Sequence, residues 1–78
     1  MIYVKEAKYK EDYKIWCRFS NGKNGIVDLK GKLWGPVFEP LQDKEKFKNF
    51  KLSDILHTIA WENGADFAPE FLCEHLQK

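Results

Sequence analysis

Hydrophobic and polar side chains alternate most regularly over residues 13–19. The side chains of one face are Tyr13, Ile15, Cys17 and Phe19, and those between them are Lys14, Trp16 and Arg18. A period of two residues is typical of a β-strand with one buried face. A looser alternation predicts a first strand over residues 2–9, and the polar residues 10–12 predict a turn between the two strands.

The turn that follows this strand decides the register of the next one, because residues 21–25 contain two Asn-Gly pairs. A two-residue turn at the first pair places Cys17 opposite Ile26 and puts Val27 on the other face of the sheet from Cys17. A longer loop through Gly25, or a glycine bulge there, shifts the register by one residue and exchanges these faces. We favour the two-residue turn.

Glycine and proline interrupt the pattern over residues 30–40, which we therefore predict to be mostly loop. The apolar side chains that we expect to cover one end of the sheet from this region are Leu33, Trp34, Val37, Phe38 and Leu41. Asp43 is expected to cap a helical turn over residues 44–48, with Phe47 turned inward. A short strand is predicted over residues 49–52.

The C-terminal stretch combines a strand, a sharp turn and the start of a helix. Residues 57–61 are apolar, aromatic or β-branched enough for a strand. Asn63 and Gly64 supply the positive φ angles of a reversal. Pro69 suits the first turn of a helix that we predict over residues 69–75. The apolar side chains that this helix can press onto the sheet are Phe71, Leu72 and Leu76.

Together these patterns predict an α+β fold: a small antiparallel sheet of four to five strands, a short helical turn, and a C-terminal helix packed on one face. Residues 1–78 form a single domain in this interpretation, and a domain of that length buries roughly 60–65% of its unfolded surface. Three Trp, three Tyr and six Phe supply much of the burial, because each aromatic ring buries on the order of 150–250 Å².

Thirteen basic and twelve acidic residues leave a formal net charge of +1. This balance argues against binding of nucleic acid or of anionic membranes by charge alone. No apolar run approaches the roughly 20 residues that span a bilayer, and the N-terminus has no apolar signal segment. The two cysteines form no Cys-x-x-Cys pair, so we expect reduced thiols in a cytoplasmic protein.

Cysteine and histidine are the first candidates for chemistry. Cys73 and His75 are of the types that bind zinc, but ligands two positions apart on a helix point to different faces. Cys17 and His57 would meet only through the tertiary fold. The sequence contains no oxyanion loop and no glycine-rich phosphate loop. We therefore predict no metal, no cofactor and no enzymatic activity.

Charged residues suggest two further hypotheses, a carboxylate cluster and a nucleic-acid surface. The carboxylates are Asp28, Asp43 and Asp66. We interpret Asp43 as a helix cap and Asp66 as an acceptor of backbone N–H groups in the turn before Pro69. Phe47 and Phe50 interleave with basic residues, as in a base-stacking surface, at Lys44, Lys46, Lys48 and Lys51. We favour a solvated lysine face over two core phenylalanines.

Tryptophan is enriched at the hot spots of protein interfaces. The three tryptophans are Trp16, Trp34 and Trp61, and so short a chain cannot bury all of them fully. We expect Trp61 in the core. Trp34 lies in the glycine-flanked loop and is the best candidate for contact with a partner, with capping of the core as its alternative.

Several of these segments together resemble a bacterial family known as domain of unknown function 2442. In order, they are Phe19-Ser20-Asn21-Gly22, Val27-Asp28-Leu29, Phe38-Glu39-Pro40-Leu41-Gln42-Asp43 with Phe47, and residues 58–66 followed by Pro69-Glu70. This chain departs from the family at Glu62, where proline is frequent, and at Cys73, where an aromatic residue is frequent. The residues of the motif that we single out, as structural or facing a partner, are Trp61, Asn63, Gly64, Asp66 and Pro69.

The resemblance implies a genomic context and leaves the activity unassigned. Genes of this family often lie beside a gene of domain of unknown function 4160, which implies a toxin–antitoxin pair with this family on the antitoxin or accessory side. Some longer members carry a helix-turn-helix domain, which this sequence lacks. We therefore predict a non-enzymatic protein-interaction module, an antitoxin-like or accessory partner of a small toxin. The alternative is a component of a nucleic-acid-binding transcriptional regulator. The oligomeric state stays open.

Overall fold

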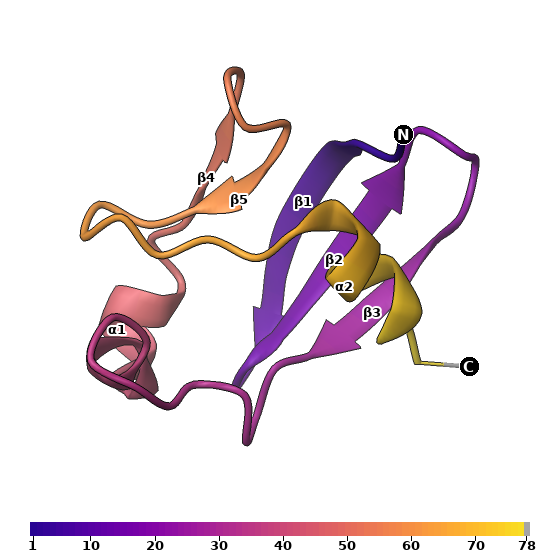
Figure 1. Ribbon diagram of the computed structural model, residues 1–78. Helices are drawn as coiled ribbons and strands as arrows, with labels where there is room; N and C mark the ends of the chain where they lie inside the picture. Colours follow the sequence, from indigo (N-terminus) through magenta and orange to yellow (C-terminus); the bar gives the residue numbers. More distant parts are fainter. Residues whose placement is uncertain (78) are drawn as a thin grey trace.

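An antiparallel meander of three strands forms one half of the molecule in the computed structural model, which describes residues 1–77. Its strands are β1 (Val4–Glu11), β2 (Lys14–Phe19) and β3 (Asn24–Asp28). The other elements, in chain order, are the 3₁₀ helix η1 (Glu39–Gln42), α1 (Lys44–Phe47), β4 (Lys51–Ser53), β5 (Thr58–Ala60) and α2 (Pro69–Glu74). In Figure 1, α2 lies over one face of the meander, while α1 and the β4–β5 hairpin lie beside β1.

The register between β2 and β3 differs from the favoured prediction by one residue. Cys17 pairs with Gly25 and not with Ile26, so the favoured two-residue turn is wrong. The loop has three residues, 20–22, and Gly22 at its end has a φ of 87°. This is a type I turn closed by a left-handed residue, and the left-handed glycine is Gly22, not the bulge at Gly25 considered as an alternative.

Burial explains why this register is preferred. The one-residue shift places Val27 and Leu29 on the same face as Ile15 and Cys17, and all four side chains are completely buried. Each large aliphatic side chain that leaves water contributes about 1.5–3 kcal/mol. The favoured turn would have turned two such side chains away from the core, and the local preference of an Asn-Gly pair is too weak to offset that loss.

The expectation of one sheet of four to five strands is also wrong, because the five strands divide into two sheets. Strands β4 and β5 pair with each other as a separate antiparallel hairpin. A single backbone hydrogen bond of 2.9 Å, from the N–H of Val4 to the carbonyl of His57, connects this hairpin to β1. His57 has a φ of 56°. That left-handed conformation turns the chain just before β5, so the contact with β1 does not continue as a ladder.

Both predicted helical segments are confirmed with small changes in their ends. The carboxylate of Asp43 accepts a 3.0 Å hydrogen bond from the N–H of Glu45 at the start of α1, and Phe47 is fully buried. Pro69 lies in the first turn of α2. Beyond α2, the N–H of Gln77 donates a 2.7 Å bond to the carbonyl of Ile26, so the end of the chain covers the free edge of β3.

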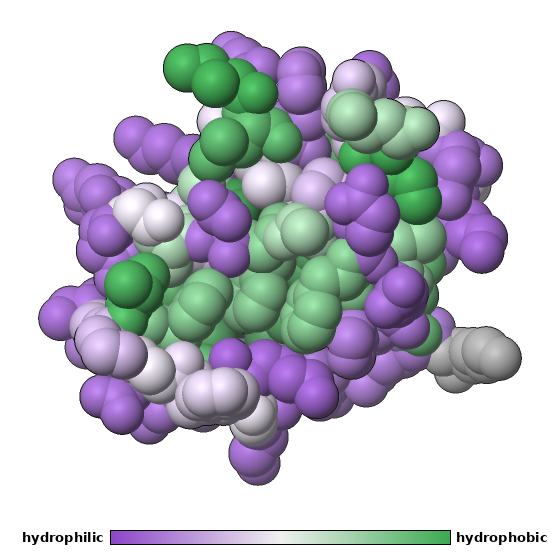
Figure 2. Space-filling model, viewed as in Figure 1, coloured by the Kyte–Doolittle hydropathy of each residue, from purple (hydrophilic) through white to green (hydrophobic). Residues whose placement is uncertain are grey.

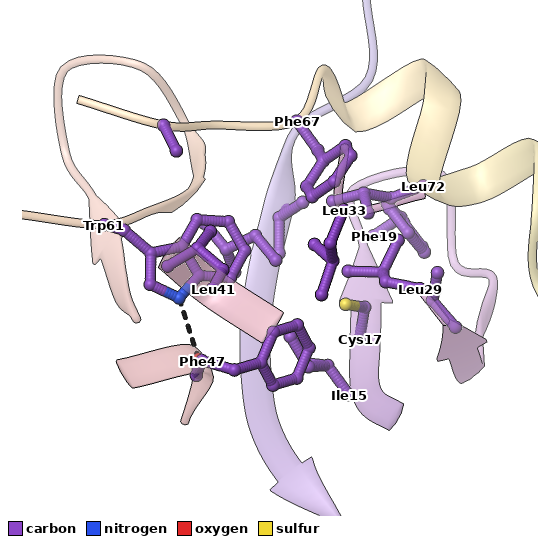
Figure 3. Close-up of a cluster of buried hydrophobic side chains, with 14 residues drawn as sticks. Ile15, Cys17, Phe19, Leu29, Leu33, Leu41, Phe47, Trp61, Phe67 and Leu72 are labelled. Carbon is purple, nitrogen blue, oxygen red and sulfur yellow. Dashed lines mark hydrogen bonds between the residues drawn. The ribbon is translucent and has the colours of Figure 1, made fainter. Parts of the chain in front are cut away.

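The core lies between the meander, α2 and the α1 region (Figure 3). Phe47 is central, because its ring lies 5.3 Å from that of Tyr13 and 5.8 Å from that of Trp61, centroid to centroid. Of the loop residues expected to cover the sheet, Leu33 and Leu41 are buried. None of the helices in residues 1–77 combines the length and the apolar character needed to cross a bilayer.

Candidate protein-interaction surface

The chain contains two copies of the same turn, each with the sequence aromatic-x-Asn-Gly. In the second copy the N–H of Gly64 donates to the carbonyl of Trp61 at 3.0 Å, and the N–H of Trp61 donates to the carbonyl of Ala65 at 2.8 Å. The Oδ1 atom of Asn63 accepts from the N–H of Ala65 at 3.1 Å. The first copy, which begins at Phe19, makes the same three bonds. An Asn-Gly pair that follows an aromatic residue at this spacing is therefore a structural element in this protein.

The second turn also ties distant parts of the chain together. The indole N–H of Trp61 donates a buried 2.7 Å hydrogen bond to the carbonyl of Phe47 in α1 (Figure 3). The Nδ2 atom of Asn63 donates to the carbonyl of Val37 at 2.8 Å, which fastens the long loop. Burial of Trp61 in the core agrees with expectation. Trp61, Asn63 and Gly64 therefore have structural roles that account for their presence.

Asp66 does not have the structural role that we expected. Its side chain is exposed, and among residues 1–77 its carboxylate accepts no hydrogen bond and forms no ion pair. Asn63, and not Asp66, accepts the backbone N–H within this turn. Pro69 contributes a rigid first turn to α2. Asp66 is the motif residue whose side chain the fold does not use.

This difference between two motif residues gives a testable prediction. Asn63→Ala removes two side-chain hydrogen bonds to backbone groups, and we expect it to lower the free energy of unfolding by about 1–2 kcal/mol. Asp66→Asn should change it by no more than about 0.5 kcal/mol, as expected for an exposed residue without partners. Urea denaturation followed by circular dichroism measures both. Equal losses for the two variants would contradict these roles.

Two exposed apolar residues lie in the long loop before η1. Trp34 is 73% exposed and Val37 is 45% exposed, so Trp34 does not cap the core. Trp16, by comparison, is half-buried on the outer face of the meander. We call Trp34 and Val37 the loop patch. Its exposure makes Trp34 available to a partner, and its role as a contact stays a prediction.

A second apolar patch lies at the tip of the β4–β5 hairpin, and sequence reasoning missed it. Its residues and exposed fractions are Leu52 39%, Ile55 87% and Leu56 51%, and we call them the tip patch. Ser53 closes the tip, because its Oγ atom accepts from the N–H groups of Ile55 and Leu56 at 3.3 and 3.0 Å. Figure 2 shows strongly hydrophobic side chains at the top of the molecule, over this hairpin.

The signal for the tip patch was present in the sequence. Residues 53–56 lie between the strands predicted over residues 49–52 and 57–61, and they place two branched aliphatic side chains in a tight turn. Serine and aspartate are the usual residues of such a turn, and isoleucine and leucine there have no local reason to be present. A water-exposed turn that contains both is typical of a surface that another molecule covers.

The two thiols lie in different surroundings. Cys17 is buried in the core, and burial raises the pKa of its thiol to about 12, so the thiol stays protonated and unreactive at neutral pH. Cys73 is half-buried on α2, where its Sγ atom lies 3.8 Å from the Nδ2 donor of Asn21. His75 stacks on Phe71. Within residues 1–77 no three potential metal ligands come together.

Of the two phenylalanines that interleave with the lysines around α1, Phe50 is half-buried and Phe47 is not exposed at all. Phe47 is fully buried and cannot stack on a nucleobase. Lys44 forms an ion pair of 2.9 Å with Asp12, and Lys48 forms one of 3.2 Å with Glu45. The pair with Lys44 lowers the pKa of Asp12 through a hydrogen bond and direct charge attraction. Half of these lysines are thus already neutralised by neighbouring carboxylates.

The fold and its surface define a small α+β domain with two exposed apolar patches. Residues 4–77 match the model of the family described as Protein of unknown function (DUF2442), so the chain belongs to that family. Neither the comparison with curated proteins nor the comparison with solved structures found a match. These findings do not test the genomic neighbour or the toxin–antitoxin context that we expected. Both therefore remain proposals.

Proposed function

We propose that this protein is a non-enzymatic protein-interaction module. The observation that carries the proposal is the exposure of two large apolar side chains. Ile55 is 87% exposed and Trp34 is 73% exposed, while other apolar side chains are buried in the core. Large apolar side chains exposed at a hairpin tip and in a loop cost solubility and add nothing to the core. A protein partner that covers them would remove this apolar surface from water, which is the main driving force of association.

We further propose that the partner is a small toxin encoded by a neighbouring gene, and that this chain is its antitoxin or accessory protein in the cytoplasm. This proposal rests on the family to which the chain belongs and on the genomic context that the family resemblance implies. The test is co-expression of the chain with the product of the neighbouring gene, followed by co-purification. Failure of a stoichiometric complex to form would contradict it.

A substitution in the loop patch should weaken binding of the partner without lowering the stability of the fold. Trp34→Ala is expected to weaken binding of the neighbouring gene's product by more than about 1 kcal/mol, or about fivefold, because exposed tryptophans are frequent hot spots. The melting temperature should stay nearly unchanged, since little of the side chain is buried. Isothermal titration measures the affinity. Trp16→Ala, on the outer face of the meander, is the control and should change the affinity less than about twofold.

The alternative is a nucleic-acid-binding component of a transcriptional regulator, and one observation favours it. All lysines and arginines other than Lys78 lie in residues 1–51, so positive charge is concentrated in the meander and the α1 region. Phosphate neutralisation supplies most non-specific affinity for DNA. Titration of labelled duplex DNA at physiological salt decides between the two. Tight binding by the chain alone, with no complex of the neighbouring gene's product, would favour the alternative.

A further inference from the structure

A row of aromatic rings crosses the face of the molecule that carries α2. The ring of Phe38 lies 4.8 Å from that of Phe67, which stacks on Phe71 at 5.3 Å, and Phe71 stacks on His75 at 4.1 Å, all measured between centroids. Phe38, Phe71 and His75 are half-buried, so each shows part of its ring to water. Figure 2 shows this face as a continuous hydrophobic band across the middle of the molecule, bordered by hydrophilic side chains.

Carboxylates accompany this row on the solvent side. Residues 65–68 are extended and alternate between buried and exposed, so Asp66 points to water beside the inward-facing Phe67. On α2, Glu70 and Glu74 are four residues apart and therefore share one exposed face of the helix, next to the face that carries Phe71. Asp66 is the motif residue whose side chain has no structural role. Its position beside the aromatic row gives that side chain a role at the surface.

The charge of this part of the chain has one sign. Between residues 52 and 77 there is no lysine or arginine, and the acidic residues are Asp54, Glu62, Asp66, Glu70 and Glu74. Within residues 1–77 every ion pair uses a carboxylate from outside this segment: that of Glu6, Asp12 or Glu45. Within residues 1–77 the acidic side chains of residues 52–77 therefore form no ion pair, in contrast to those around α1.

We propose that the aromatic row and its carboxylates, which we call the acidic aromatic face, dock a cationic amphipathic segment of a partner protein. The face is defined by Phe38, Asp66, Phe67, Glu70, Phe71, Glu74 and His75. Apolar side chains of the partner cover the exposed parts of the rings, and its lysines or arginines pair with the carboxylates. This inference rests on the proposed function, because it specifies the chemistry of the partner that the module binds.

The same charges exclude two other classes of ligand from this face. Phosphate groups of nucleic acid and of anionic lipids would be repelled by Asp66, Glu70 and Glu74, and residues 52–77 contain no lysine or arginine. A cationic protein segment gains from the same field, since opposite charges raise the rate of encounter and fix the orientation of docking. The complement is a surface with basic residues around apolar ones.

Two designed peptides of equal length test the inference without knowledge of the natural partner. One is an amphipathic helix built of leucine and lysine, and the other replaces every lysine by glutamate. Each is titrated into the isotope-labelled full chain while the amide resonances are followed by NMR. We expect the lysine peptide to bind, with shifts confined to the acidic aromatic face, and to bind more weakly as ionic strength rises. The glutamate peptide should not bind.

Two double variants, matched in net charge, then show whether binding of the lysine peptide depends on the position of the carboxylates or on the net charge of the protein. Glu70→Gln/Glu74→Gln removes two exposed carboxylates of the face and should weaken binding of the lysine peptide at least about threefold. Glu11→Gln/Glu45→Gln changes the net charge by the same amount away from the face and should leave the affinity within about twofold. Both pairs are exposed, so both proteins should fold, and circular dichroism confirms it.

Each outcome decides the inference. Equal binding of the two peptides, equal effects of the two double variants, shifts mapped elsewhere, or binding of DNA or anionic vesicles at this face would each overturn it. The proposed function is judged separately with the neighbouring gene's product. If that product binds the chain and Glu70→Gln/Glu74→Gln alike, the proposed function stands and the acidic aromatic face is wrong. If it does not bind at all, the proposed function fails, while the peptide comparison still decides the chemistry of this face.

Discussion

A chain that ends at Ala68 is expected to be unfolded or aggregated at room temperature. Its missing part contains Leu72, which is fully buried against the meander, and the residues that cover the edge of β3. Burial of a leucine side chain alone contributes about 1.5–3 kcal/mol, and Phe71 and Leu76 add partial burial. The total approaches the whole stability of a small domain, about 5 kcal/mol at the low end.

Thermal and urea denaturation followed by circular dichroism measure this effect. Leu72→Ala in the full chain should have a smaller effect of the same kind and lower the free energy of unfolding by about 2–5 kcal/mol. Cys73→Ala is the matched control on the same helix, since its side chain is half-buried and its removal should cost much less. A cooperative melt of the shortened chain close to that of the full chain would show that α2 is not part of the folding unit.

Trp61→Ala is expected to be the most damaging single substitution, with a loss of about 3–5 kcal/mol in the free energy of unfolding. The indole is 6% exposed and contacts the rings of Phe47, Phe50 and Phe67. Its N–H also satisfies the buried carbonyl of Phe47 at 2.7 Å. Trp61→Ala therefore leaves both a cavity and an unpaired carbonyl, and the second has a cost of its own.

Trp61→Phe separates these two contributions, because it retains an aromatic ring but removes the hydrogen-bond donor. We expect it to lower the free energy of unfolding by about 1–3 kcal/mol, the cost of an unsatisfied buried acceptor. Trp34→Ala is the control, since a side chain that is 73% exposed contributes little to stability. Chemical denaturation measured on all three variants tests the order. A loss for Trp34→Ala as large as that for Trp61→Ala would contradict the assigned positions.

The candidate surface could be predicted from the sequence only in part. Trp34 was singled out because tryptophan is frequent at interface hot spots and it lies in the glycine-flanked loop. The sequence left capping of the core as the alternative, and the structure shows Trp34 exposed while Leu33 beside it is buried. The tip patch was not predicted, because most of it lies in residues 53–56, which only link two predicted strands. The acidic aromatic face needed coordinates, since Phe38 and Phe71 are far apart in the sequence and meet through Phe67 only in the folded chain.

The sequence by itself determined the local elements. The alternation over residues 13–19, the cap at Asp43 and the proline at position 69 each act within a few residues, so each predicted its strand or helix start. Family membership was also readable, because several segments between Phe19 and Glu70 occur in the order and spacing of the family.

Only the tertiary structure decided the register of β3 and the division into two sheets. An Asn-Gly pair is compatible with turns of different length, and burial of Val27 and Leu29 selected the three-residue loop. The five strands divide into two sheets, and His57, between β4 and β5, has a φ of 56° that the sequence pattern did not predict. At the turn between β2 and β3, long-range packing outweighs local preference, because a buried side chain contributes more free energy than a turn preference does.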